Sequence, residues 1–330
     1  MPVPDWARVH GPPLFAAAIR QHIDDFVVHE LLGFEFSGEG EHDYLHIEKR
    51  AANTEWVGRQ LAAFAGVPAR DIGYSGMKDR HAVARQWFSV PRWNKPDWQK
   101  LEVDGVQVLE QQRHHRKLKR GAHQLNHFRI IMRGELPTAS SIDLRLATIA
   151  EEGVPNYFGE QRFGRGGGNL ALVDQWAAGK RLPRHKRSIA ISSARAFLFN
   201  QSLQQRVQQQ TWNRLLPGDV ANLDGTGSVF TVEAVDADIE RRCQAMDLHP
   251  AGMLFGDGAS KVGIGEEYLP WCAALEKARA KVAHRSLRLR PQAFSWTMDA
   301  ASLTLEFSLR RGSFATAVLR EIALIANAQG

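Results

Sequence analysis

The sequence has few of the features that mark secreted, membrane-spanning or metal-binding proteins. Only two of its 330 residues are cysteines, Cys243 and Cys272, and no Cys-x-x-Cys pair occurs. Two distant thiols do not make a disulfide framework or a metal-binding cluster, so a reducing, cytoplasmic compartment is expected. No segment approaches the roughly 20 apolar residues that span a bilayer, and the first residues hold no signal-peptide core. These absences argue against a membrane or secreted protein.

Nucleotide and metal fingerprints are also missing. Residues 164–169 read GRGGGN, without the glycine spacing of a dinucleotide-binding or P-loop motif, and are expected to form a flexible turn. His114 and His115 are adjacent and would point to opposite sides of a strand, which rarely lets two ligands share one ion. No metal site is therefore expected.

The composition suits a basic protein of two domains. Because domains commonly contain ~100–200 residues, 330 residues with 44% hydrophobic content indicate two of them. Lysine and arginine total 42 against 36 aspartate and glutamate, which gives a formal charge of +6. This excess fits a polyanionic partner, although many basic enzymes carry as much charge.

Local patterns predict strands and helices in an α+β order. Residues 22–32 and 42–50 are expected to be strands of one hairpin, joined by a turn over residues 37–41. A helix should begin at the capping pair Asn53-Thr54 and stop at Gly66. A second helix is expected around residues 142–149, before Gly153.

The far end of the sequence predicts a strand followed by a helix. Apolar residues alternate with polar ones over residues 303–310, which is typical of a half-buried strand. A helix is expected to start at Gly312-Ser313 and run through Val318, Ile322 and Ile325. This small unit should return to complete the first domain, since it cannot bury a core alone.

Asp79 lies in the densest motif of the sequence, GMKDRH, in a polar loop before a strand-like segment. One interpretation is a solvated turn in which charged neighbours surround the aspartate. The other is a carboxylate kept ionised by the flanking cations Lys78 and Arg80, as a nucleophile or general base requires.

Two strand segments could place polar groups beside aromatic rings. Phe26 and Glu30 share one strand face, as do Asn126 and Phe128. They could be core rings with edge polar groups. Alternatively, an amide and a ring together can recognise a uracil, because the amide pairs with the base edge while the ring stacks on its face.

Cations are concentrated in residues 113–133, which contain seven Lys/Arg and four His residues. Such a segment is either a solvated surface or a contact for a phosphate backbone. The residues that we assign to the RNA backbone are Arg116, Lys117, Lys119 and Arg120. A second, weaker group that could touch the same polyanion consists of Arg181, Arg184, Lys186 and Arg187.

Several of these segments together resemble the TruD family of tRNA pseudouridine synthases. They occur in the family's order and extend over almost the whole chain. The combination of KDRHA with PNYFGEQRFG is the most specific part. The matching segments are FVVHE (26–30), Asn53-Thr54, GMKDRHAVARQW (76–87), LNHF (125–128), VPNYFGEQRFG (154–164) and GSFATAVLREI (312–322).

The resemblance implies an enzyme that isomerises a uridine of tRNA, usually at position 13, to pseudouridine. No cofactor is needed, since the reaction neither changes redox state nor adds a group. Asp79 corresponds to the family's catalytic aspartate, as a nucleophile toward sugar or base or as a base at the 2′ carbon. Arg20 replaces the lysine that the family usually places near this carboxylate. The implied substrate-binding set is Phe26, Glu30, Lys78, Asn126 and Phe128.

The resemblance also implies the architecture. It predicts an α+β fold with a mixed, largely antiparallel sheet and helices, interrupted by an inserted TRUD domain. Residues 1–153 plus 297–330 would form the catalytic pseudouridine synthase domain, and residues 154–296 the insertion. The partner is tRNA, and no obligate protein partner is evident.

Two other classes of protein remain possible from the residues alone. A noncatalytic RNA-binding protein would use the same basic segments and would not need Asp79. A nuclease would release cleaved RNA, and a methyltransferase would depend on a methyl donor. The missing metal cluster and nucleotide fingerprint argue against the last two.

Overall fold

The structure is a computed structural model that describes residues 2–327. Its chain divides into two compact units, each made of three segments. The large-sheet unit comprises Pro13–Asp143, Pro291–Gly312 and Ala323–Gly330. The helix-rich unit comprises Met1–Pro12, Leu144–Arg290 and Ser313–Ile322. The assignment of a catalytic domain and an insertion at residues 154–296 stays a prediction.

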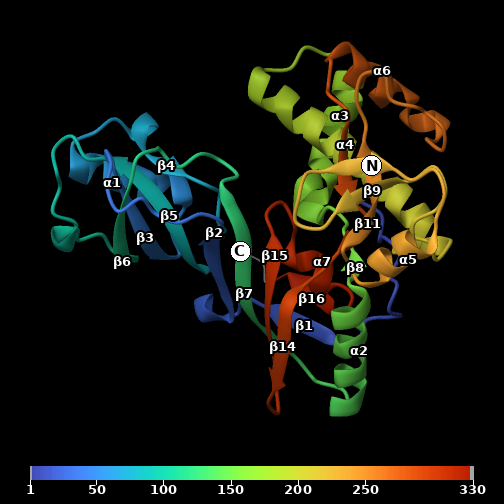
Figure 1. Cartoon of the computed structure of the whole chain (residues 1–330), viewed down its shortest axis with the longest axis horizontal. Helices are drawn as coiled ribbons and strands as arrows, with labels where there is room; N and C mark the ends of the chain where they lie inside the picture. Colours follow the sequence, from blue (N-terminus) through green and yellow to red (C-terminus); the bar gives the residue numbers. More distant parts are fainter. Residues whose placement is uncertain (1, 328–330) are drawn as a thin grey trace. The chain divides into compact units, whose positions relative to one another are not determined.

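The large-sheet unit is built on one mixed, mostly antiparallel sheet of ten strands (Figure 1). Seven strands follow the order β14-β15-β7-β2-β5-β3-β6, while β1 pairs with β7 and β16, and β4 with β5. The predicted α+β class with a largely antiparallel sheet is therefore confirmed. The strands are β1 (Ala16–Ile19), β2 (Phe26–Leu32), β3 (His42–Arg50), β4 (Gly73–Tyr74), β5 (Val83–Pro91), β6 (Val106–His114), β7 (His123–Arg133), β14 (Gln292–Met298), β15 (Ser302–Arg310) and β16 (Leu324–Asn327).

The predicted hairpin of β2 and β3 is wrong, because β5 lies between them (Figure 1). β5 pairs antiparallel with β3 over its whole length and parallel with β2 at Val27–His29. The strand predicted from His22 also begins later, since Ile23–Asp25 forms a short 3-10 turn. Alternating polarity predicts a strand but not its partner, and β3 pairs on both edges, with β5 and β6.

Helix α1 (Thr54–Ala65) covers part of this sheet, and its predicted limits are confirmed. Asn53 occupies the N-cap position, and Gly66 ends the helix with a left-handed φ of 64°, which glycine adopts without steric cost. Val57 and Leu61 pack with Leu45 of β3 in one buried cluster. Residues 67–82, which carry the Asp79 motif, therefore connect a fixed helix to a buried strand.

The helix-rich unit has a core in which aromatic rings surround the long helix α4. Phe197 of α4 lies 5.5 Å from Trp6, 5.3 Å from Tyr268 and 5.4 Å from Trp271, measured between ring centroids. A four-stranded sheet in the order β10-β9-β11-β12 and a short β8–β13 pair complete this unit. Its elements are β8 (Val154–Pro155), α3 (Gly168–Ala177), α4 (Arg184–Gln208), β9 (Val220–Leu223), β10 (Val229–Thr231), α5 (Ala237–Gln244), β11 (Leu248–Leu254), α6 (Leu269–Lys277), β12 (Ala283–Ser286), β13 (Arg288–Leu289) and α7 (Ala315–Leu319).

The predicted second helix is confirmed as α2 (Ala139–Glu152), followed by Gly153 at a φ of 78°. The predicted strand over residues 303–310 is confirmed as β15, which pairs with β7. The helix expected after it is wrong beyond Leu319, because residues 324–327 form β16. There the chain forms backbone hydrogen bonds with β1 instead of continuing the helix, in a parallel register that starts at Ala16 and Leu324. Within residues 2–327, no helix has the length and apolar character needed to cross a membrane.

Candidate active site

Asp79 lies in the loop between β4 and β5 of the large-sheet unit, with its side chain 48% exposed. Its Oδ2 accepts a hydrogen bond from Nη2 of Arg20 at 2.5 Å. Among the described residues, no donor contacts the other carboxylate oxygen. The carboxylate is thus ion-paired on one side and accessible to a ligand on the other.

Arg20 comes directly after β1 and holds an unusual backbone conformation. Its φ is 63°, in the left-handed region that residues with a Cβ rarely adopt. The guanidinium lies 4.2 Å from the centroid of the Phe26 ring, in a cation–π contact. Its Nε is buried and has no hydrogen-bond partner within residues 2–327. Strain of this kind persists where the surrounding structure holds it, and it is concentrated at functional sites.

The predicted aromatic pair comes together across β2 and β7. The register pairs Val28 with Phe128, so Phe26 and Phe128 lie diagonally on one face of the sheet. Their ring centroids are 6.0 Å apart in an edge-to-face arrangement, and both rings are buried. Through Phe26 and Arg20, this aromatic face is connected directly to the carboxylate of Asp79.

Behind the loop, Lys78 forms the centre of a buried polar network. Its Nζ donates to Oε2 of Glu30 at 2.7 Å and to Oδ1 of Asn126 at 2.8 Å. Burial raises the pKa of Glu30, and the charge of Lys78 opposes this shift. Each of these two charges is buried and is stabilised by the other, so separating them would be strongly unfavourable. The ion pair with Glu30 therefore holds Lys78, the residue next to Asp79, in place.

His123 extends the network to Ser75. Burial, with the charge of Lys78, lowers the pKa of His123 to about 4, so its imidazole is neutral near pH 7. Because Oδ1 of Asn126 accepts from Lys78, its amide Nδ2 donates to Nε2 of His123 at 3.2 Å. The Nδ1 of His123 then carries the hydrogen and donates to Oγ of Ser75 at 2.6 Å.

Two further residues hold the loop backbone on either side of the peptide that joins Lys78 and Asp79. Oγ1 of Thr54, at the start of α1, accepts from the backbone N–H of Lys78 at 3.0 Å. Lys49 of β3 donates to the carbonyl oxygens of Asp79 at 2.8 Å and of Ala52 at 2.7 Å. Lys49 is fully buried, and burial lowers its pKa to about 8.

Lys49, Ser75 and His123 are not among the site residues predicted from the sequence. A signal for Lys49 was present, because Lys49 shares a strand face with Leu45 and Ile47, which are both fully buried. A cation on an apolar strand face has to find internal oxygen partners. The structure supplies them from the loop that carries Asp79.

The four predicted RNA-backbone residues lie together in the connection between β6 and β7, and all are exposed. Buried Leu118 anchors the connection between them. Arg120 donates to the hydroxyl of Tyr74 at 2.6 Å, and its guanidinium lies 3.9 Å from that ring's centroid. Within residues 2–327, none of Arg116, Lys117, Lys119 and Arg120 forms an ion pair, so their charges are available to an anion.

The predicted substrate-binding residues are therefore close together in one unit. Phe26 contacts both Arg20 and Phe128, whereas Glu30, Lys78 and Asn126 mainly bond to one another. Direct contact of the latter three with a substrate stays a prediction. In the described part of the chain, no group of three or more His, Cys, Asp or Glu side chains is placed to hold a metal ion.

Comparisons with known proteins identify the family of this chain. The sequence matches the family model for tRNA pseudouridine synthase D (TruD) over residues 10–176 and 170–322. A tRNA pseudouridine synthase D of Methylococcus capsulatus is 42% identical over 332 residues, covering 96% of this chain and 94% of the relative. The protein of the same name from Nitrosococcus oceani is 44% identical over 335 residues, covering 97% and 94%.

A solved structure also shares the fold. The crystal structure of a Methanosarcina mazei protein described as a tRNA pseudouridine synthase D superposes with a TM-score of 0.70, covering 99% of this chain and 96% of that chain. Its sequence is 20% identical, so it supports the architecture alone. From the family-model match over nearly all residues and relatives above 40% identity, the chain belongs to the tRNA pseudouridine synthase D (TruD) family.

Proposed function

We propose that this protein is a tRNA pseudouridine synthase that isomerises uridine 13 of tRNA, with Asp79 as its catalytic residue and without a cofactor. The observation that carries the proposal is the geometry of Asp79. Its carboxylate is half exposed, paired with Arg20 on one oxygen, and held through its own backbone by a buried lysine. A reactive carboxylate needs this combination of access and fixed position.

The chemistry requires no group beyond those in the substrate. The bond from C1′ of the ribose to N1 of uracil breaks, and the electron pair leaves with N1. The uracil turns, C5 bonds to C1′, the proton on C5 is lost and N1 gains one. Asp79 acts either as the nucleophile toward sugar or base, or as the base that removes the 2′ proton and returns it.

The target base has to leave its stack to reach Asp79. Phe26, whose ring contacts the Arg20 that pairs with Asp79, and its neighbour Phe128 would replace the lost stacking. Because the guanidinium of Arg20 covers the ring of Phe26, a uracil that stacks there replaces it. The exposed cations of the β6–β7 connection would hold the tRNA through its phosphates, which carry most of the binding energy and no sequence information.

The direct test is to incubate the purified protein with unmodified tRNA transcripts, without added cofactor. Pseudouridine is then mapped by chemical labelling and primer extension. Conversion confined to position 13 is the expected result. An unmodified transcript, or modification at another position alone, would contradict the proposal. Because tRNA is the proposed substrate, we also propose a cytoplasmic location. The same assay tests whether the enzyme acts without an obligate protein partner.

Substitutions of Arg20 should separate its charge from its backbone strain. Arg20→Lys keeps the positive charge beside Asp79 and is expected to keep most of the activity. Arg20→Ala and Arg20→Gly both remove it and should lower kcat by about 10- to 100-fold. Because glycine adopts a φ of 63° freely, the glycine variant should be ~1 kcal/mol more stable than the alanine variant in urea unfolding. Equal stability of these two would contradict the strain assigned to Arg20.

Lys49→Met should reduce turnover without weakening tRNA binding. Lys49 contacts the backbone of Asp79 and not the substrate, so its loss lets the carboxylate shift. A misplacement of about 1 Å costs on the order of 100-fold in rate, so kcat should fall while KM stays within about twofold. Lys100→Met, at an exposed lysine of the same unit, is the matched control and should leave both constants unchanged. A rise in KM with constant kcat would show that Lys49 acts on binding instead.

A further inference from the structure

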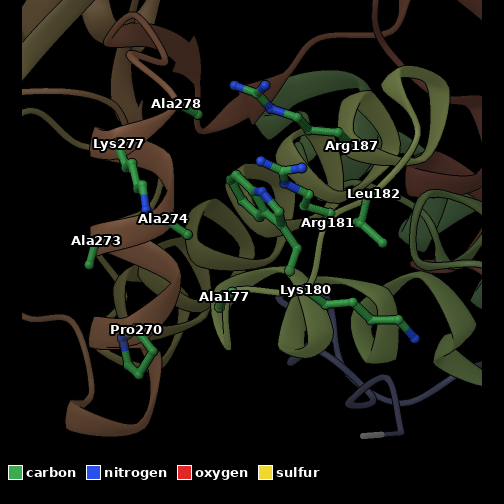
Figure 2. A pocket seen from close by; sticks show the side chains of 12 residues that line it. Ala177, Lys180, Arg181, Leu182, Arg187, Pro270, Ala273, Ala274, Lys277 and Ala278 are labelled. Carbon is green, nitrogen blue, oxygen red and sulfur yellow. The ribbon is translucent and has the colours of Figure 1, made fainter.

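The helix-rich unit contains a basic pocket that the chemistry of Asp79 does not use. Its volume is about 560 Å³, within the range of small-ligand sites. One wall consists of the end of α3, the connection to α4 and the start of α4, and the other wall is α6. Figure 2 shows Arg181 and Arg187 extending from the first wall toward the helix that carries Lys277, while Lys180 points away.

The pocket is positively charged and lacks acidic groups. Lys180, Arg181, Arg187 and Lys277 line it, together with apolar residues and no Asp or Glu. Within residues 2–327, none of these four cations forms an ion pair. The nearby Glu276 of α6 is already paired with Lys261 at 3.0 Å. An anion would therefore meet uncompensated charge here.

The stability of α4 does not explain the arginines at its start. Arg187 lies in the first turn of α4, which contains no acidic residue, and a cation at this end of a helix opposes the helix dipole. Arg184, in the same turn, lines a second hollow of about 530 Å³ that shares Arg187 with the first. The charges thus continue along the surface, as a site for a chain of phosphates requires.

Trp176 supplies the feature that distinguishes a nucleotide from a simple anion. It lines the pocket, and it is only partly buried against the core of the unit. Small side chains line much of the rest of the pocket, namely Ala177, Ala273, Ala274 and Ala278. An indole next to guanidinium groups offers a stacking surface for a base beside contacts for its phosphates.

We propose that this pocket binds an unpaired nucleotide of the substrate tRNA and anchors it at a second point, in a different unit from Asp79. The inference rests on the proposed function, since it assumes that tRNA is the substrate. It adds a binding site without a role in the chemical step. Loss of the pocket should therefore weaken tRNA binding and raise KM, while kcat at saturating tRNA stays unchanged.

The test compares two full-length double variants with equal loss of charge. Arg181→Gln with Arg187→Gln removes the pocket guanidinium groups, and Arg214→Gln with Arg290→Gln removes two exposed cations of the same unit outside it. Affinity for a tRNA transcript is measured by fluorescence anisotropy at several salt concentrations. The pocket variant should bind about tenfold or more weakly at 0.1 M salt, with a salt slope reduced by about 1.4–2. The control should stay within about threefold of wild type.

A third variant and a second ligand complete the test. Trp176→Leu keeps apolar packing but removes the stacking surface, and it should weaken binding about fivefold or more. Equal affinities of the pocket and control variants would overturn the inference. The inference would also be overturned if the pocket variant no longer bound free UMP but kept the tRNA affinity of wild type. If the wild-type protein binds tRNA through the pocket but forms no pseudouridine, the proposed activity is refuted and the pocket inference is not.

Discussion

The Asp79→Asn variant is expected to lose pseudouridine formation while folding normally. Asparagine has the same shape and can still accept a hydrogen bond from Arg20. It carries no negative charge, so it can neither attack a carbon nor remove a proton. We expect kcat to fall by at least about 10³-fold, since each of the roles open to Asp79 depends on the ionised carboxylate.

Normal folding of this variant follows from the exposure of the Asp79–Arg20 pair. The two side chains are 48% and 21% exposed, and ion pairs at such positions contribute at most about 1 kcal/mol. The loop itself is held by Thr54 and Lys49, which bond to its backbone and not to the carboxylate. The midpoint of urea unfolding should therefore stay close to that of wild type.

Asp24→Asn is the matched control for this experiment. Asp24 also pairs with an arginine, Arg50, at 2.7 Å in the same unit, and its side chain is 63% exposed. The same chemical change there should leave turnover unchanged. Both variants are compared in single-turnover reactions with excess enzyme, which isolate the chemical step from tRNA release. More than a tenth of wild-type turnover in Asp79→Asn would refute its catalytic role.

Lys78→Met is expected to give the largest loss of stability. The substitution leaves Glu30, which is fully buried, without the ammonium that compensates its charge, and leaves Asn126 without a donor. Removing one partner of a buried ion pair typically costs about 3–5 kcal/mol. The free energy of unfolding, measured in urea, should fall by that amount. Arg50→Met, which breaks the exposed pair with Asp24 and a longer contact of 3.8 Å with Glu48, should cost less than about 1 kcal/mol.

The pH dependence of this loss identifies Glu30 as its source. Burial raises the pKa of Glu30 above its ordinary 4.5, and without Lys78 nothing of comparable strength opposes the rise. A carboxyl with a raised pKa binds a proton more tightly in the folded than in the unfolded state. Its contribution is therefore most favourable below pH 4.5, and stability decreases as the pH rises toward the folded pKa.

A second substitution at Glu30 provides the control for Lys78→Met. Adding Glu30→Gln removes the buried charge, so the double variant should be more stable than Lys78→Met alone at pH 8 and should lose the pH dependence. If Lys78→Met unfolds as easily at pH 5 as at pH 8, the energetic role assigned to the buried pair is wrong.

The sequence predicted the elements whose conformation depends on neighbouring residues, such as α1 and β15. Asn53 and Gly66 marked the ends of α1 because residue preferences at helix ends are local, although the side chain of Asn53 forms no capping hydrogen bond among the described residues. Alternation marked β15 for a similar reason. The neighbours of β2 and β3 could not be predicted in this way, because β5, their shared partner, comes from a later segment. Residues 324–327 continue a helical spacing, but pairing with β1, more than 300 residues earlier, decides their conformation.

The candidate site divides in the same way. The resemblance pointed to Asp79, Arg20, Phe26, Asn126 and Phe128, and the structure places these residues in one unit. The hydrogen bonds and ion pairs that connect them are tertiary contacts, which the spacing of residues in the sequence does not predict. The bond from Lys49 to the Asp79 carbonyl joins β3 to a loop some 30 residues later. The family assignment and fold class are confirmed, and the individual residue roles stay predictions.

The pairing of β1 with β16, and of β7 with β15, imposes an order on folding during synthesis. As the ribosome releases the chain from its N-terminus, one edge of β1 and one edge of β7 emerge long before β16 and β15, which pair with them. Contacts of such large sequence separation form late and slow folding. The edge of β7 is open to pairing with other chains until β15 has been made, and the edge of β1 until β16 has been made. The large-sheet unit is therefore expected to complete its fold only after β16 has been synthesised.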